Sequence, residues 1–158
     1  MPYTTSLNLL ILVNGCGIPT RVLIGLLADR YLGVMNTMTL SLLVDIIALF
    51  SWLAVRSSSQ YYVFTVFYGL ASAAFQALFP TSIAALSNDI TKTGTRLGMA
   101  FAVIGFAALL GGPIAGWTVK GGGYNAAICW AGASTIIGMG LGVSSRILKY
   151  GWSLRTKC

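Results

Sequence analysis

The chain of 158 residues is 56% hydrophobic, has only 8% charged residues and has a mean hydropathy of +0.82. Soluble domains contain roughly 25% charged residues, so this composition excludes most soluble folds and indicates a protein of the lipid bilayer. The net charge of +7 does not indicate binding to nucleic acid, because the basic residues lie between apolar segments rather than on one water-exposed face.

The residue types that are missing argue against enzymatic chemistry. The sequence has no His and no Glu, and its three carboxylates are Asp29, Asp45 and Asp89. These three are not spaced as a catalytic pair or a metal site. The three cysteines are odd in number and include no C-x-x-C pair, which argues against a disulfide framework. We therefore expect no enzyme activity, no cofactor and no metal.

Five segments are long and apolar enough to cross a bilayer, which takes about 20 residues in a helix. They cover residues 7–28, 34–55, 61–86, 97–119 and 126–145. A helix of a soluble bundle shows a polar face, whereas these segments are apolar nearly all round. The sequence predicts an all-α integral membrane protein with five transmembrane helices, short connections and a polar tail over residues 146–158.

The first span contains a buried charge, Arg21, about 10 Å from its predicted cytoplasmic end at 1.5 Å per residue. An arginine at that depth costs several kcal/mol unless it faces protein or water. Asn14 lies on the same helical face, and a guanidinium in such a recess can bind a carboxylate through two hydrogen bonds. The alternative is an arginine that extends to the lipid headgroups.

The second span contains Asp45 at its middle, without a basic residue within a helical turn. A carboxylate that faced lipid there would be costly if it were ionised. Three interpretations remain open: the carboxyl is protonated, it pairs with Arg21 on the neighbouring helix, or it takes part in proton coupling.

The third span contains a polar stripe of Thr65, Tyr68, Ser72 and Gln76 at helical spacing. These side chains can hydrogen-bond a polar solute while neighbouring aromatic rings cover its apolar part. Hydrogen bonding between the helices themselves explains the stripe equally well.

Three of the five spans contain an interior proline, at Pro19, Pro80 and Pro113. Each proline is a helix-break position in the sense that it removes one backbone hydrogen bond and frees the carbonyl four residues earlier. Neighbouring helices or a wet cavity can satisfy that carbonyl. A packing kink explains any single proline, but three such helices favour a bundle that bends around a pathway.

The basic residues outside the spans predict the orientation, because Lys and Arg in short loops favour the cytoplasmic side. Seven fall on one side of the predicted bundle, namely Arg30, Lys92, Arg96, Arg146, Lys149, Arg155 and Lys157. Arg56 and Lys120 fall on the other. We therefore expect an outside N-terminus and a cytoplasmic C-terminus. An odd number of helices with an outside start indicates a chain whose preceding helices are missing.

Residues 25–33 read G-L-L-A-D-R-Y-L-G, which resembles the G-x-x-x-D-R motif of the major facilitator superfamily. In that family the motif lies in a cytoplasmic loop between paired helices, once in each six-helix half. Gly25, Asp29 and Arg30 match it, and the charge count independently places this loop inside. The glycine that usually follows the aromatic residue directly is displaced to Gly33, and the usual basic pair is absent.

Further segments are similar to the C-terminal half of monocarboxylate-porter-like members, especially the fungal branch. They are Arg21 itself, the run 89–101 and the segment 112–116. The resemblance covers essentially the whole chain, as helices eight to twelve of a twelve-helix fold. Arg21 falls on an arginine position of animal members, whereas Gly17 stands where those members have an Asp. The resemblance places the first, third and fourth spans at the central cavity and the second and fifth at the periphery.

The resemblance implies an alternating-access carrier of small organic anions of the monocarboxylate type. Arg21 would hold the anionic group, and Gly25, Asp29 and Arg30 would form a cytoplasmic gate. The residues expected to line the path are Asn14, Tyr68, Ser72 and Gln76.

The expected partners are the solute with or without a proton, the lipid bilayer, and a missing N-terminal half or other membrane helices. The plasma membrane is favoured over an organelle membrane. The alternative function is a non-transporting membrane fragment or subunit that acts only by packing with other helices.

Overall fold

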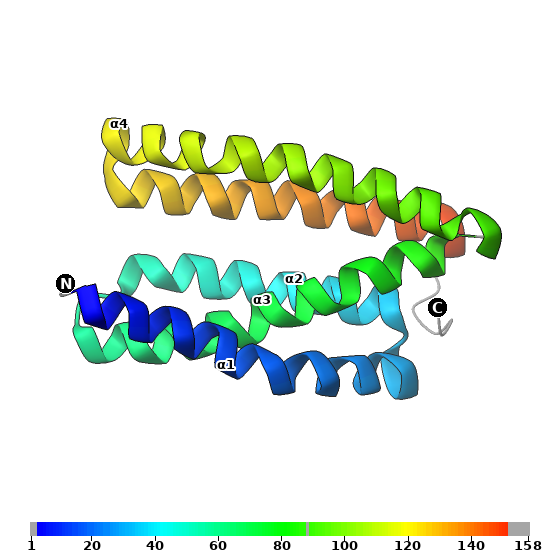
Figure 1. Cartoon of the computed structure of the whole chain (residues 1–158), viewed down its shortest axis with the longest axis horizontal. Coiled ribbons are helices and arrows are strands. Elements are labelled where there is room, and N and C mark those ends of the chain that lie inside the picture. The colour runs from blue at the N-terminus through cyan, green and yellow to red at the C-terminus, as the bar shows by residue number, and fades with distance from the viewer. Residues whose placement is uncertain (1–2, 88, 152–158) are drawn as a thin grey trace.

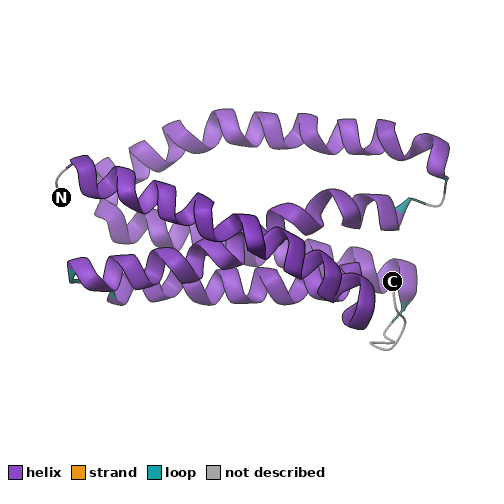
Figure 2. Ribbon diagram, turned by 60° about the horizontal axis from the view of Figure 1, so that its bottom comes forward, coloured by secondary structure: helices purple, strands orange, loops and turns teal. Residues whose placement is uncertain are grey.

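The computed structural model describes residues 3–151 except residue 88, and these residues form long helices joined by short connections (Figure 1, Figure 2). The long helices are α1 (Tyr3–Leu27), α2 (Val34–Ser51), α3 (Ser58–Leu86) and α4 (Thr93–Tyr150). Short helical turns follow the first three, namely η1 (Ala28–Leu32), η2 (Trp52–Ala54) and η3 (Ile90–Lys92). The described part of the chain contains no strand, so the prediction of an all-α fold is confirmed.

The described residues contain four helical elements of membrane length, and the last of them holds two of the five predicted segments. The segments 97–119 and 126–145 both belong to α4, which is 58 residues long. At Gly123 the backbone adopts φ 75° and ψ −177°, a conformation that glycine reaches most readily because it has no Cβ. The chain reverses there, so that α4 is a hairpin of two helical arms (Figure 1). The turn is too tight to leave a separate loop, so the fourth and fifth predicted segments are the two arms of one helical element.

The two arms of α4 have different surroundings. We call residues 93–122 the outgoing arm and residues 124–150 the returning arm. The returning arm packs on α2, where a Cβ on Gly132 would lie 2.7 Å from the Phe50 ring and one on Gly142 would lie 3.7 Å from Met38. The outgoing arm is exposed at every residue from 101 to 117. Of the tail predicted over 146–158, residues 146–150 continue α4, and residues 152–158 lie outside the described part.

The packing of α1 against α3 depends on small residues. A Cβ added to Gly17 would lie 3.1 Å from the Cβ of Ala73, and one added to Gly69 would lie 3.1 Å from the Cα and carbonyl oxygen of Val13. Without a side chain at these glycines the two backbones approach closely, which is how membrane helices commonly pack. This contact places the middle of α1 directly beside the middle of α3.

Buried apolar side chains gather where the end of α1, the start of α2 and the second half of α3 meet. Ala28, Val34 and Leu78 are 1%, 8% and 2% exposed, and Ile24 and Met38 pack against them. This cluster holds the three helices together near the turn between α1 and α2.

The prolines do not interrupt their helices. Pro19, Pro80 and Pro113 lie inside α1, α3 and α4, and each helix continues on both sides. The helix-break positions, in the sense of a lost hydrogen bond and a kink within a continuing span, stay a prediction. In α4 the helix is interrupted at Gly123, where a positive φ reverses the chain. The missing N–H of a proline removes only one hydrogen bond from its helix.

The close contact between α1 and α3 predicts unequal effects of two glycine substitutions. Gly69→Ala should lower the free energy of unfolding by about 1–3 kcal/mol, because its Cβ meets backbone atoms that cannot rotate away. Gly105→Ala is the matched control, since a Cβ there meets nothing within 4 Å. It should leave stability unchanged or raise it by up to about 1 kcal/mol. Denaturation of both variants in detergent measures the difference, and equal stabilities would contradict the packing described.

Candidate functional site

Arg21 and Gln76 form a hydrogen bond that joins α1 to α3. The Arg21 Nη2 donates to the Gln76 Oε1 at 3.0 Å. Arg21 lies one helical turn after Gly17, and Gln76 lies three residues after Ala73, so the bond follows directly from the close approach of Gly17 to Ala73. Gly17 therefore brings the guanidinium of Arg21 within reach of the Gln76 amide.

The guanidinium of Arg21 keeps most of its donors available. Arginine has five N–H donors, and among the described residues Gln76 accepts from one of them. Arg21 is exposed in this chain. A guanidinium with several unengaged N–H groups can bind a carboxylate through two parallel hydrogen bonds.

Asn14 and Ser72 make hydrogen bonds within their own helices. The Asn14 Nδ2 donates to the carbonyl of Leu10 at 2.9 Å, and the Ser72 Oγ donates to the carbonyl of Gly69 at 3.5 Å. Asn14 keeps its amide oxygen as an acceptor, and the long bond of Ser72 is weak. Neither side chain contacts Arg21 through a hydrogen bond of the described residues.

Tyr68 lies on the side of α3 that faces α2. Its ring stacks on Phe64, with centroids 5.7 Å apart, and its hydroxyl lies within electrostatic range of Asp45. The structure therefore brings Gln76 to Arg21 and places Tyr68 near a different charged group.

The proposed pairing of Asp45 with Arg21 is wrong. Arg21 donates to Gln76, and the one ion pair within the described part of the chain joins Lys92 to Asp89. The Oδ1 of Asp45 is buried and accepts no hydrogen bond from any described residue. The sequence spacing suggested the pair because α1 and α2 are consecutive, but α3 packs against α1 and supplies the partner.

The segment that resembles the gate motif forms the turn between α1 and α2. Gly25 lies near the end of α1, and the exposed Asp29 and Arg30 lie in the π-helical turn η1. The turn ends at Gly33, whose φ of 79° closes it and whose N–H donates to the carbonyl of Ala28 at 2.8 Å. Glycine takes this positive φ without strain, so Gly33 has a structural role in ending the turn.

No cluster of three or more metal-ligating side chains occurs in the part of the chain that the structure describes. Comparison with family models gives no match, and comparison with solved structures gives none either. Comparison with curated proteins does give relatives, and those described next are named as transporters or as an efflux protein.

An MFS-type transporter of Gibberella zeae is 39% identical over 149 residues, which cover 93% of this chain and 34% of that protein. The chain belongs to the major facilitator superfamily. A riboflavin transporter of Saccharomyces cerevisiae is 32% identical over 111 residues, 69% of this chain and 21% of that protein. An aspyridones efflux protein of Emericella nidulans is 31% identical over 96 residues, 61% of this chain and 20% of that protein.

This major facilitator chain thus spans about a third or less of the length of the curated relatives it matches. Together with its long apolar helices, the relationship identifies it as a multi-pass membrane protein. The recognition from the motif at 25–33 is confirmed at the level of the superfamily.

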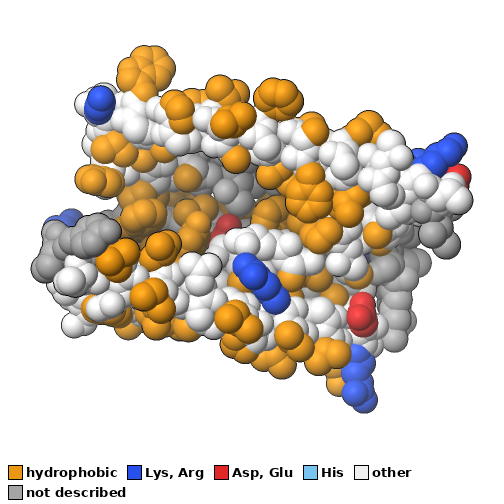
Figure 3. All heavy atoms as spheres, viewed as in Figure 1, with side chains coloured by type: hydrophobic (Ala, Val, Ile, Leu, Met, Phe, Trp, Pro, Cys, Tyr) orange, Lys and Arg blue, Asp and Glu red, His pale blue; other side chains and the backbone are white. Residues whose placement is uncertain are grey.

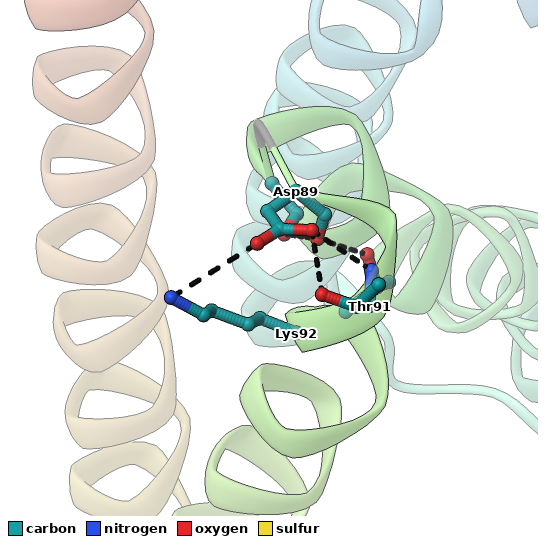
Figure 4. Close-up of polar contacts among 5 residues, drawn as sticks. Asp89, Thr91 and Lys92 are labelled. Atoms are coloured by element: carbon teal, nitrogen blue, oxygen red, sulfur yellow. Dashed lines mark hydrogen bonds and ion pairs between the residues drawn. The ribbon is translucent and has the colours of Figure 1, made fainter.

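At one end of this major facilitator chain, the connection between α3 and α4 is built around Asp89 (Figure 4). Its Oδ1 accepts hydrogen bonds from the Thr91 hydroxyl at 2.6 Å and the Thr91 N–H at 3.1 Å, and its Oδ2 lies 3.9 Å from the Lys92 Nζ. The returning arm reaches the same end, where the Lys149 Nζ donates to the carbonyl of Ala85 at 3.0 Å. Sequence reasoning missed this last contact because the two residues are 64 positions apart and neither belongs to a motif.

The environment of Asp89 predicts a pH effect. The Thr91 hydroxyl, then the Thr91 N–H and the charge of Arg96, hold the pKa of the Asp89 carboxyl below its ordinary value. A depressed pKa in the folded state contributes stability above the ordinary pKa, and this stability is lost as the pH falls toward the folded-state pKa. Thr91→Val should therefore raise the pKa of Asp89 and weaken this acid dependence.

Titration of the ¹³C-labelled carboxyl of Asp89 by NMR in detergent measures the shift. Thr93→Val is the matched control, because the Thr93 hydroxyl donates to the backbone carbonyl of Asp89 at 3.2 Å and not to its carboxylate. The control should leave the pKa of Asp89 unchanged. Equal titration curves for wild type and Thr91→Val would show that the hydroxyl does not set the pKa.

Proposed function

We propose that this chain is part of a major facilitator carrier that moves a small organic anion across a membrane. The hydrogen bond between Arg21 and Gln76 is the observation that carries the proposal, because it holds a guanidinium at membrane depth beside a second helix. The relatives support transport as the activity, since their names are those of transporters. A membrane-embedded arginine is costly unless it faces protein, water or an anion, and an anionic solute satisfies the unengaged N–H groups.

Gln76 acts in this proposal as a positioning residue for Arg21. Its Oε1 holds one guanidinium nitrogen, which leaves the other edges of the planar group for a bidentate carboxylate. The amide nitrogen of Gln76 can donate to a second oxygen of the solute. Asn14 lies two turns before Arg21 on the same face and offers its amide oxygen. Ser72 lies one helical turn before Gln76 on α3 and would line the path there.

The gate and the orientation belong to the same proposal. The turn η1 with Asp29 and Arg30, the connection between α3 and α4, and the end of the returning arm all lie at one end of the bundle (Figure 1). Most of the basic residues outside the spans lie there, which favours the cytoplasmic side for this end. The segment 25–33 would then restrain the helices on that side as the carrier alternates between its two open states.

The remaining helices of the carrier would pack on the outgoing arm of α4. This arm is exposed from 101 to 117, and a Cβ at Gly105, Gly112 or Gly116 would meet nothing within 4 Å. These three glycines share one face of the helix at spacings of seven and four. A face of small residues lets another membrane helix approach closely.

Substitution of Arg21 tests the proposed anion site. In a chimera, this chain replaces the matching segment of the Gibberella zeae transporter. Uptake into yeast that express the chimera is measured for labelled acetate, lactate, benzoate, succinate and riboflavin. Arg21→Ala should reduce uptake of the transported anion at least about tenfold, because a charge-assisted hydrogen bond contributes about 1.5–3 kcal/mol. Arg21→Lys should retain part of the activity, since it keeps the charge and loses the planar fork.

Arg56→Ala is the matched control, because Arg56 is exposed in the connection between η2 and α3. It should transport as the unchanged chimera does, with equal amounts of protein in the membrane. Full uptake by Arg21→Ala would exclude Arg21 as the anion-binding group.

A further inference from the structure

A second charged group lies inside the bundle, away from Arg21. Asp45 lies in α2 at the middle of a membrane-length helix, and its Oδ1 is buried without a hydrogen-bond partner among the described residues. Figure 3 shows that the molecule is hollowed between α4 and the helices beneath it. An ionised carboxylate at membrane depth requires a compensating charge or donor, and the described residues supply none to this oxygen.

The carboxylate lines a cavity of about 520 Å³ between α2, α3 and the returning arm of α4. This volume is in the range of sites for small organic molecules. The rings of Phe75 and Phe79 form part of its wall, and so do the side chains of Ser134, Thr135 and Ser145. Arg21 and Gln76 are not among the residues that line it, so the cavity is separate from the proposed anion site.

The hydroxyl groups of this cavity are placed to act as acceptors. Ser134, Thr135 and Ser145 each donate the hydroxyl hydrogen to the carbonyl four residues earlier in α4, at 2.9 Å in every case. A hydroxyl has one hydrogen and two lone pairs, so these oxygens have only lone pairs left to offer. The polar wall therefore presents one carboxylate and three hydroxyl acceptors, without a Lys or Arg among its described residues.

The aromatic side chains of the wall favour the same kind of ligand. The ring centroids of Phe75 and Phe79 lie 5.9 Å apart with an angle of 56° between the planes. The face of an aromatic ring attracts a cation by its quadrupole, most strongly where water is excluded. A negative charge, acceptor oxygens and aromatic rings together are the features that bind an alkylated ammonium group.

We propose that the cavity formed by Asp45, Phe75, Phe79, Ser134, Thr135 and Ser145 binds a small organic ammonium cation. The carboxylate of Asp45 neutralises the ligand, the hydroxyl oxygens accept from its N–H or polarised C–H groups, and the two rings cover its alkyl groups. The inference does not depend on the anion site, because the two sites share none of these residues.

Binding of choline to the purified chain tests the proposal, with 3,3-dimethyl-1-butanol as a neutral ligand of the same shape. Equilibrium binding is measured in a non-ionic detergent at pH 8. The wild type should bind choline at least tenfold more tightly than the neutral alcohol. Asp45→Asn should remove this preference, because it should weaken the binding of choline at least tenfold and leave the binding of the alcohol unchanged. Phe79→Leu should weaken choline about threefold.

Two further variants keep the test decisive. Thr135→Val keeps the shape of the side chain and removes its acceptor oxygen. It should therefore weaken the binding of choline although Asp45 is still present. Asp89→Asn removes an exposed carboxylate at the end of the bundle and should leave choline affinity as in wild type. Helix content by circular dichroism confirms that each variant is folded. Equal binding of choline and the alcohol to wild type would overturn the proposal, since the carboxyl would then keep its proton, and unchanged choline affinity in Asp45→Asn would overturn it as well.

Discussion

The close contact of α1 with α3 is the constraint on which the proposed anion site depends. Gly17 meets Ala73, and Gly69 meets the backbone of Val13, so the two helices approach without side chains between them. Arg21 then reaches Gln76 with a hydrogen bond of 3.0 Å. A larger residue at either glycine would press the two helices apart at this contact.

The same contact explains why the two interior charges have separate surroundings. Because α3 packs against α1 on one side and α2 on another, Gln76 faces Arg21 while Tyr68 lies near Asp45. Arg21 is left with donors to spare, and Asp45 is left with an unpartnered oxygen in a cavity lined by acceptors. One bundle thus presents a site suited to an anion and a separate site suited to a cation.

Features that depend on local sequence could be predicted well. Apolar segments of membrane length appear as helices, and the motif at residues 25–33 correctly indicated the superfamily. The tight reversal at Gly123 was not predicted, because composition does not show that a positive φ will turn the chain between two helical arms without a loop. Pro19 and Pro80 lie inside their predicted spans, and each helix continues past the single missing hydrogen bond.

Features that depend on distant residues could be predicted only in part. Arg21 and Gln76 were each singled out by their helical faces, but 55 residues separate them and the sequence does not show which helix packs on α1. Pairing Arg21 with Asp45 assumed that consecutive helices are the closest neighbours. The contact of Lys149 with the end of α3 follows from the return of α4, which only the structure shows.

The most direct test of the central claim is the protection of Arg21 from phenylglyoxal by an organic anion, read at each arginine by mass spectrometry. The account predicts that at least one carboxylate among acetate, lactate, benzoate and succinate slows modification of Arg21 and leaves the exposed Arg56 unaffected. If none of these anions changes the rate at which Arg21 is modified, the result would contradict the account.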